Sequence, residues 1–152
     1  MGAGMSDKVL VHVSRIRIRW SDMDEFGHVN NAVFFTYLET ARIEWLHEIG
    51  CAPNTQGEGP VLVNASCSFL KQLRYPGEVE VRTLIGEIGR SSFMSYGEIR
   101  RVDDPTVLIG EGGAKVVWID FQRQKSQPLS DALRACIVRP TQAALAALGR
   151  AG

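Results

Sequence analysis

The segment SDMDEFGHVNNAVFFTYLETARIEWLHEIG (residues 21–50) changes from polar to apolar near its middle. From residue 31 onward, apolar side chains recur at spacings of three and four. They are Phe34, Leu38, Ala41, Trp45 and Ile49. This spacing places them on one face and predicts a long helix over residues 31–49. Asn30 or Asn31 is suited to cap the start of this helix, and Gly50 is suited to end it.

Five strand-like runs surround the predicted helix. One precedes it at residues 9–20, and four follow at 61–73, 78–88, 91–102 and 107–121. The four later runs are separated by short turn sequences, which favours antiparallel pairing. In the first run the apolar residues shift from odd to even positions near Ser14, which predicts a bulge there. Glycines at 110, 112 and 113 predict a second bulge in the last run. The order predicts an α+β fold in which one antiparallel sheet of about five strands curls around the helix.

The chain is predicted to form a single domain over residues 1–152. Residues 1–8 are expected to lie outside the fold or to derive from cloning. Residues 128–152 are expected to form a C-terminal tail with a short helix at 141–149. The segment 51–60, CAPNTQGEGP, reads as a loop.

Composition excludes several classes of protein. Lysine plus arginine and aspartate plus glutamate both number 17, so the formal net charge is zero, which argues against a nucleic-acid partner. No apolar run approaches the roughly 20 residues that span a bilayer, so no membrane partner is expected. The chain has three cysteines, none in a CxxC pair, and its start has no recognisable signal peptide. These features indicate reduced thiols and a cytoplasmic location.

The sequence predicts no metal site. The three histidines lie near no pair of cysteines, which argues against zinc. An EF-hand reading of the acidic segment fails, because Phe26 and Val33 fall where calcium ligands are required. The segment GEGGAK (residues 110–115) lacks the spacing of a Walker loop.

The junction before the helix carries candidate chemistry. The start of a helix directs free N–H groups and a partial positive charge outward, and such donors can polarise a carbonyl group. A carboxylate just upstream, from Asp22 or Asp24, can then attack that carbonyl or activate a water. Gly27 allows a close approach of the backbone to a substrate. The same residue types are also ordinary in loops and caps, so spacing alone leaves both interpretations open.

The sequence resembles the hotdog-fold acyl-CoA thioesterases of the 4-hydroxybenzoyl-CoA thioesterase-like family. The resemblance rests on DMDEFGHVNNAVFFTYLETAR (22–42), GEVEVRT (77–83) and GRSSF (89–93), and it extends from about residue 15 to 121. It implies a hotdog fold and hydrolysis of an acyl-CoA thioester to a carboxylic acid and coenzyme A. It also implies dimers or tetramers with sites at subunit interfaces, and neither a metal nor a cofactor.

By position, the resemblance assigns the catalytic aspartate to Asp24, acting as nucleophile or general base. The N–H groups near Asn30 and Asn31 would polarise the thioester carbonyl. The phosphates of coenzyme A would lie near Arg90, Ser91 and Ser92. Glu39 and Asn64 are candidates for the second half of the site. His28 is a candidate base, although a role in holding the turn fits its position better.

Two other functions compete with thioester hydrolysis. A non-catalytic acyl-CoA-binding protein would not need a carboxylate facing the thioester. Hotdog hydratases and dehydratases have a motif in which Asp and His are five residues apart. Asp24 and His28 are four apart, so the sequence fits this class less well. The sequence leaves the acyl group undetermined.

Overall fold

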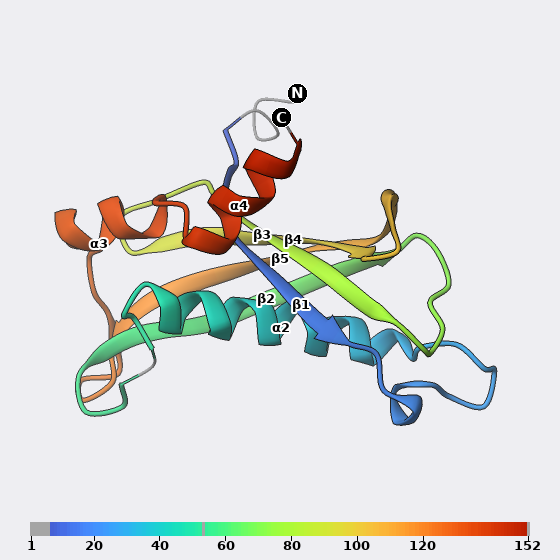
Figure 1. The fold of residues 1–152 in the computed structure, drawn as a ribbon. Helices are drawn as coiled ribbons and strands as arrows, with labels where there is room; N and C mark the ends of the chain where they lie inside the picture. Colours follow the sequence, from blue (N-terminus) through green and yellow to red (C-terminus); the bar gives the residue numbers. More distant parts are fainter. Residues whose placement is uncertain (1–6, 53, 152) are drawn as a thin grey trace.

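The computed structural model describes residues 7–52 and 54–151, in which an antiparallel sheet curls around one long helix, α2 (Asn31–Glu48) (Figure 1). The sheet order is β1–β3–β4–β5–β2. The strands are β1 (Val9–Arg17), β2 (Glu58–Phe69), β3 (Glu78–Gly86), β4 (Ser92–Arg101) and β5 (Asp104–Asp120). A short strand, β6 (Lys125–Ser126), pairs with β5. The predicted α+β architecture, with five main strands and a central helix, is confirmed.

Helix α2 has the boundaries that its capping residues predict. The Asn30 side chain accepts a hydrogen bond from the Ala32 N–H, which satisfies one of the free donors at the helix start. Gly50 adopts a φ of +76° just after the helix, a conformation that glycine accepts without strain. The predicted apolar face is buried except for Ile49, which is half-buried.

Two facing glycines let α2 approach the centre of the sheet. Gly97 on β4 and Gly112 on β5 are paired in register, and a side chain at either position would collide with Leu38 of the helix. A Cβ on Gly112 would lie 2.8 Å from Leu38 Cδ1 and 2.5 Å from the Ser66 carbonyl oxygen. The absence of side chains at this crossing therefore sets how closely the helix and the sheet pack.

Both predicted irregularities are present, but at shifted positions. In β1 the register shifts between Leu10 and His12 rather than at Ser14. In β5 the irregularity lies opposite the step from Ile99 to Arg100, while Gly110, Gly112 and Gly113 remain paired. A bulge adds one residue to a strand and so shifts which residues face the core. Its position depends on how both strands pair.

Several elements differ from the predicted ranges. The first strand ends at Arg17, and the chain then forms a 3₁₀ turn, η1 (Trp20–Asp22). Strand β2 begins at Glu58 and ends at Phe69, because residues 70–73 turn over the start of α2. The tail forms two helices, α3 (Asp131–Ile137) and α4 (Gln142–Ala151), of which only the second is predicted by the sequence. Residues 1–6 lie outside the described residues, whereas the Lys8 ammonium lies 3.7 Å from the centre of the Tyr96 ring.

The core has two parts along α2. Around the first half of the helix, Phe34, Tyr37 and Leu38 pack against Val79 and Ile99 of the sheet. Around the second half, Trp45 and Leu46 pack against Phe93, and Leu133 and Ile137 of α3 join them. The C-terminal tail therefore completes one end of the core, while the other end of α2 stays open around its N-terminus.

Among the described residues, no helix is long and apolar enough to cross a membrane.

Candidate active site

Asp22 is a structural residue. The residue is 2% exposed, and its carboxylate accepts hydrogen bonds from the Arg19 N–H and side chain and, at 2.8 Å, from the Tyr37 hydroxyl. Burial alone raises the pKa of a carboxyl group, but these hydrogen bonds and the charge of Arg19 outweigh it, so the pKa of Asp22 is lowered. Burial and the same carboxylate raise the pKa of Tyr37. Asp22 therefore fixes η1 against α2 and is not available to a substrate.

Asp24 lies two residues further on, in a different environment. Its Oδ1 accepts from the Phe26 N–H at 2.9 Å, and its Oδ2 accepts from the Asn30 side-chain amide at 3.2 Å. The side chain is half-buried and lines a groove of about 640 Å³. Two neutral donors therefore orient the carboxylate without burying it, which leaves it accessible as a nucleophile or base.

The start of α2 lies beside this carboxylate. Asn30 serves two purposes, because its carbonyl oxygen caps the helix while its amide nitrogen holds Asp24. Asn31, the first residue of the helix, lines the same groove. Among the residues that the structure describes, no hydrogen-bond acceptor is found for the Asn31 N–H, as expected at the first position of a helix. The site thus combines a carboxylate, a free N–H group and the positive end of a helix dipole.

The His28 side chain is held by an arginine from another segment of the chain. Its Nε2 lies 3.1 Å from Nη2 of Arg74 in the β2–β3 connection. Because a guanidinium group only donates, Nε2 acts as the acceptor and the ring hydrogen is on Nδ1. The nitrogen that faces Arg74 is therefore occupied, and this contact joins the loop before α2, in which Gly27 has a φ of +79°, to the β2–β3 connection.

The groove beside Asp24 has a mixed lining of polar and apolar side chains that the sequence did not reveal. It is lined by Phe26, Val29, Phe34, Phe69, Leu70, Lys71, Gln72 and Leu73, together with Asp24, His28, Asn30 and Asn31. The segment 70–73 reaches the site because Val29 N–H donates to the Leu73 carbonyl at 2.7 Å. The sequence predicts this segment as the end of a strand. Apolar side chains suit both a strand and a groove wall, so the sequence alone does not distinguish the two.

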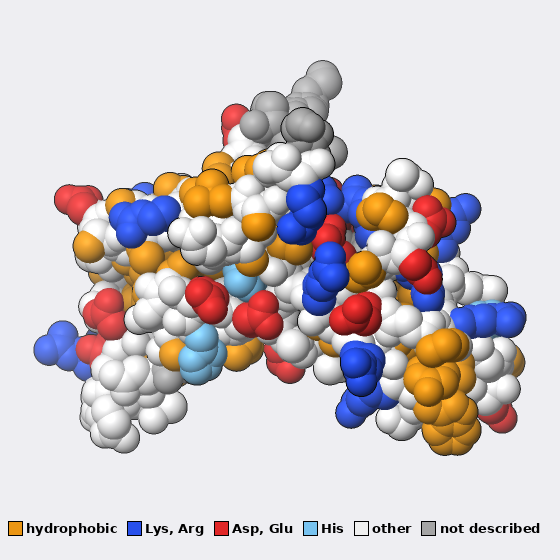
Figure 2. Space-filling model, in the orientation of Figure 1, with side chains coloured by type: hydrophobic (Ala, Val, Ile, Leu, Met, Phe, Trp, Pro, Cys, Tyr) orange, Lys and Arg blue, Asp and Glu red, His pale blue; other side chains and the backbone are white. Residues whose placement is uncertain are grey.

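Exposed aromatic side chains stand at the same end of the molecule. Figure 2 shows an apolar patch at the end that carries η1 and the loop before α2. In that segment Trp20 is 72% exposed and Phe26 is 78% exposed. Phe26 also lines the groove, so apolar surface continues from the groove to the outside.

Arg90, Ser91 and Ser92 lie far from Asp24 within one chain. The loop that carries Asp24 is bonded to Leu73, just before β3 begins, whereas Arg90 follows the end of β3. Strand β3 has nine residues, which at about 3.3 Å per residue separates the two groups by roughly 30 Å. Figure 1 shows the same separation, with the β3–β4 turn close to α3 and the Asp24 loop at the opposite end. A single chain therefore does not bring together the two predicted halves of the site.

The remaining candidates are also outside the groove. Asn64 lies at the bulge of β2, where its side-chain oxygen accepts from the Lys115 N–H at 3.3 Å. Glu39 is exposed on α2. Neither residue lines the groove that contains Asp24.

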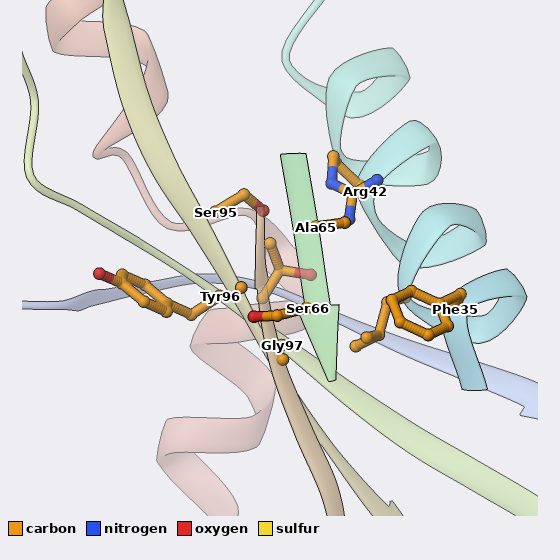
Figure 3. A pocket seen from close by; sticks show the side chains of 11 residues that line it. Phe35, Arg42, Ala65, Ser66, Ser95, Tyr96 and Gly97 are labelled. Atoms are coloured by element: carbon orange, nitrogen blue, oxygen red, sulfur yellow. The ribbon is translucent and has the colours of Figure 1, made fainter. Parts of the chain in front are cut away.

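A second hollow lies between α2 and the sheet. Figure 3 shows Arg42 extending from the helix toward the sheet beside Ala65 and Ser95, with Phe35 further along the helix. Among the described residues, no acceptor is within reach of the buried Arg42 Nε. Burial lowers the pKa of Arg42, and Glu39 partly offsets this effect. The hollow of about 10 Å³ has room for about one water molecule, so the larger groove is the candidate active site.

Comparison with known proteins identifies the family. The model of the thioesterase-like superfamily matches residues 18–137, which include the Asp24 loop, α2 and the whole sheet from β2 to β5. This chain belongs to the thioesterase-like superfamily. The superfamily is one of thioester hydrolases, and the predicted enzyme class and hotdog fold are confirmed.

Three proteins illustrate the range of similarity. The PA2801 protein from Pseudomonas aeruginosa is 38% identical with a TM-score of 0.80, and the match covers 84% of this chain and 98% of that chain. The BH1999 gentisyl-coenzyme A thioesterase is 25% identical with a TM-score of 0.71, covering 82% and 98%. The chloroplastic acyl-acyl carrier protein thioesterase ATL3 from Arabidopsis thaliana is 28% identical, covering 78% of this chain and 62% of the relative.

Proposed function

We propose that this thioesterase hydrolyses acyl-coenzyme A to a free carboxylic acid and coenzyme A. The observation that carries the proposal is the position of the Asp24 carboxylate beside the N-terminus of α2, at the edge of a groove with apolar side chains on part of its wall. An apolar acyl group fits the side chains of Phe34, Phe69 and Leu70, while the thioester lies between the carboxylate and the helix start.

In this mechanism the two groups act on the same carbonyl. The Asn31 N–H and the positive end of α2 stabilise the negative charge that develops on the thioester oxygen. Asp24 either attacks the carbonyl carbon or removes a proton from an attacking water, and in both cases coenzyme A leaves as its thiol. Asn30 positions Asp24 for either reaction, because its amide holds one carboxylate oxygen while its own oxygen remains fixed by the helix cap.

We further propose that coenzyme A binds at a site shared by two subunits. Within one chain, Arg90–Ser92 and Asp24 lie at opposite ends of the sheet. A two-fold dimer that pairs the edge strands in antiparallel fashion places the Asp24 end of one sheet next to the Arg90 end of the other. The phosphates would then contact the partner subunit's Arg90, while the thioester would reach Asp24.

Strand β2 supports such a dimer, because it forms one edge of the sheet. Its apolar side chains remain in contact with solvent, since Val63 is 54% exposed and Leu62 is 42% exposed. Phe69 and Leu70 add exposed apolar area where β2 ends, next to the groove. Open strand edges of this kind invite pairing with another chain. Trimming these side chains is therefore expected to weaken self-association.

The test is turnover across a panel of acyl-CoA esters, with the released thiol trapped by a coloured reagent. Short-chain, long-chain and aromatic acyl groups should be included, because the aliphatic and aromatic side chains of the groove suit all three. Hydrolysis of at least one ester supports the proposal. Tight binding without thiol release would instead support an acyl-CoA-binding protein, and hydration of an enoyl ester without thiol release would support a hydratase.

A further inference from the structure

Two of the three cysteines meet at the end of α2 that lies far from the groove. Cys51 lies three residues after the end of α2, and Cys136 lies in the last turn of α3. Both thiols donate to one acceptor, the Ile49 carbonyl oxygen, at 3.8 Å for Cys51 Sγ and 3.5 Å for Cys136 Sγ. The shared oxygen keeps the two sulfur atoms in one neighbourhood, where the Cys136 thiol affects the pKa of Cys51, although the residues are far apart in the sequence.

The surrounding packing holds this arrangement in place. The Cys51 N–H donates to the Leu46 carbonyl at 2.8 Å, which fixes the chain as it leaves α2. On the other side, Leu133 and Ile137 anchor α3 in the core cluster that contains Trp45. Both thiols are half-buried and line one groove of about 430 Å³, so a small reagent can reach them.

We propose that Cys51 and Cys136 form a reversible intramolecular disulfide by exchange with a small-molecule disulfide. One protein thiolate attacks the reagent, forming a mixed disulfide and releasing one small thiol. The second protein thiolate then displaces the other small thiol and closes the Cys51–Cys136 bond. Two electrons pass from the protein to the reagent, and the two protons end on the two small thiols that leave.

The remaining cysteine provides an internal control. Cys67 lies on β2, where its thiol donates to the Ser68 carbonyl at 3.8 Å and packs against the other core cluster. It is half-buried, as Cys51 and Cys136 are. No second thiol accompanies it among the residues that the structure describes, so Cys67 is not expected to form an internal bond.

The environment of the pair predicts how its reactivity depends on pH. Burial and the neighbouring Cys136 thiol raise the pKa of Cys51. Because the thiolate is the attacking species, exchange should be slow at neutral pH and should accelerate as the pH rises toward this pKa. Once formed, the bond would join the end of α2 to α3 and close a long loop.

The Cys51–Cys136 disulfide would also restrain the β3–β4 turn. Nη2 of Arg134, two residues before Cys136, donates to the Gly89 carbonyl at 2.7 Å and to the Arg90 carbonyl at 3.3 Å. Oxidation would therefore hold α3, and with it the backbone of this turn, against the end of α2. The loop closure restricts the unfolded chain, so the oxidised protein should unfold at a higher temperature.

The experiment treats the full-length protein with oxidised glutathione at several pH values and follows intact mass and free thiols. The expected product has lost two hydrogen atoms without a glutathione adduct, its free thiols fall from three to one, and its melting temperature rises. Cys67→Ser should still lose the two hydrogens, whereas Cys51→Ser and Cys136→Ser should not. Circular dichroism checks that each variant is folded.

Other outcomes would overturn the proposal. If folded wild-type protein keeps all three thiols at alkaline pH, or acquires only glutathione adducts, the pair does not close. If Cys51→Ser or Cys136→Ser loses two hydrogens as readily as the wild type, Cys67 takes part and the assignment is wrong. Each of these results is independent of thioesterase activity.

Discussion

Asp22 and Asp24 show how strongly a short separation in the sequence can change the role of a side chain. The first carboxylate is enclosed by Arg19 and Tyr37, and the second faces the groove at the start of α2. Burial and hydrogen bonding suit Asp22 to hold structure, and accessibility suits Asp24 to meet a substrate. Substitution of each aspartate should therefore affect a different measurement.

Asp24→Asn should reduce kcat by at least about 100-fold, because the amide keeps the size of the side chain but is neither a nucleophile nor a base. The melting temperature should change little, since Asp24 is held only by one backbone and one side-chain donor. Steady-state kinetics with the best acyl-CoA ester measure the first quantity. Turnover close to that of the wild type would rule out the proposed mechanism.

Asp22→Asn should have the opposite effect. It should keep most of kcat but lower the free energy of unfolding by about 1–3 kcal/mol at neutral pH, because a buried charged acceptor is lost. The folded-state pKa of Asp22 lies below the unfolded value of 3.8, so its contribution is complete above that value and is lost as the pH falls through the folded pKa. Denaturation of both proteins between pH 7 and pH 2.5 should show the difference shrinking at the acid end; a constant difference would contradict this account.

Arg90→Ala should raise KM for acyl-CoA about 3- to 10-fold with little change in kcat, because a phosphate contact is equal in the ground and transition states. It should also make KM less sensitive to salt. Arg150→Ala on α4 is the matched control, since Arg150 is also an exposed arginine in a remote element. If KM is unchanged in Arg90→Ala, this arginine does not bind coenzyme A.

At the scale of elements, the contact between α2 and the sheet depends on residues without side chains. Leu38 sits over the paired glycines Gly97 and Gly112, at the centre of the sheet. The groove beside Asp24 lies at the N-terminal end of the same helix, away from this crossing. Enlarging a glycine at the crossing should therefore disturb the fold rather than the chemistry.

Gly112→Ala should lower the free energy of unfolding by about 1–3 kcal/mol, because the new methyl group would lie 2.5 Å from the Ser66 carbonyl, and backbone cannot easily move away. Gly149→Ala in α4 is the control. Nothing lies within 4 Å of its Cβ position, so alanine should be neutral or stabilising by about 0.5–1 kcal/mol. Urea denaturation of the two variants provides the comparison, and equal stability would show that the sheet yields at Gly112.

At the scale of the whole molecule, the distance between Asp24 and Arg90 makes a shared site testable. If each site takes Asp24 from one chain and Arg90 from the other, a dimer of Asp24→Asn with Arg90→Ala has one site with both defects and one with neither. Activity after subunit exchange should then exceed that of both parent variants. Exchange can be verified by differently tagged chains.

Two results would contradict shared sites. One is a lack of gain on mixing when both parents are impaired and exchange is verified. The other is sedimentation of the active enzyme as a monomer at assay concentration. Substituting Val63 and Leu62 with charged residues should shift the enzyme toward monomers, and a loss of activity in parallel would connect the β2 edge to function.

The sequence by itself determined the central helix and the main strands, whereas the assignment of catalysis to Asp24 rather than Asp22 came from the family resemblance and stays a prediction. The helix and the strands depend on local chemistry, such as the apolar spacing of α2 and the cap at Asn30. The alternation in residues 9–20 indicated a bulge, and the structure contains one. The sequence did not predict α3, because seven residues give too short a periodic pattern. The Ser130 cap and the four-residue spacing from Leu133 to Ile137 are nevertheless present.

Only the tertiary structure decided what surrounds these residues. The segment 70–73 became a wall of the groove through a backbone hydrogen bond from Val29 to Leu73, which no local pattern encodes. Arg74 reached His28 and occupied its Nε2, and Asp22 was enclosed by residues from two elements. Likewise, Cys51 and Cys136 met at one carbonyl oxygen, and Arg90 was placed at the far end of the sheet from Asp24. Long-range pairing fixes such positions, because they depend on the packing of elements distant in the chain rather than on the preferences of neighbouring residues.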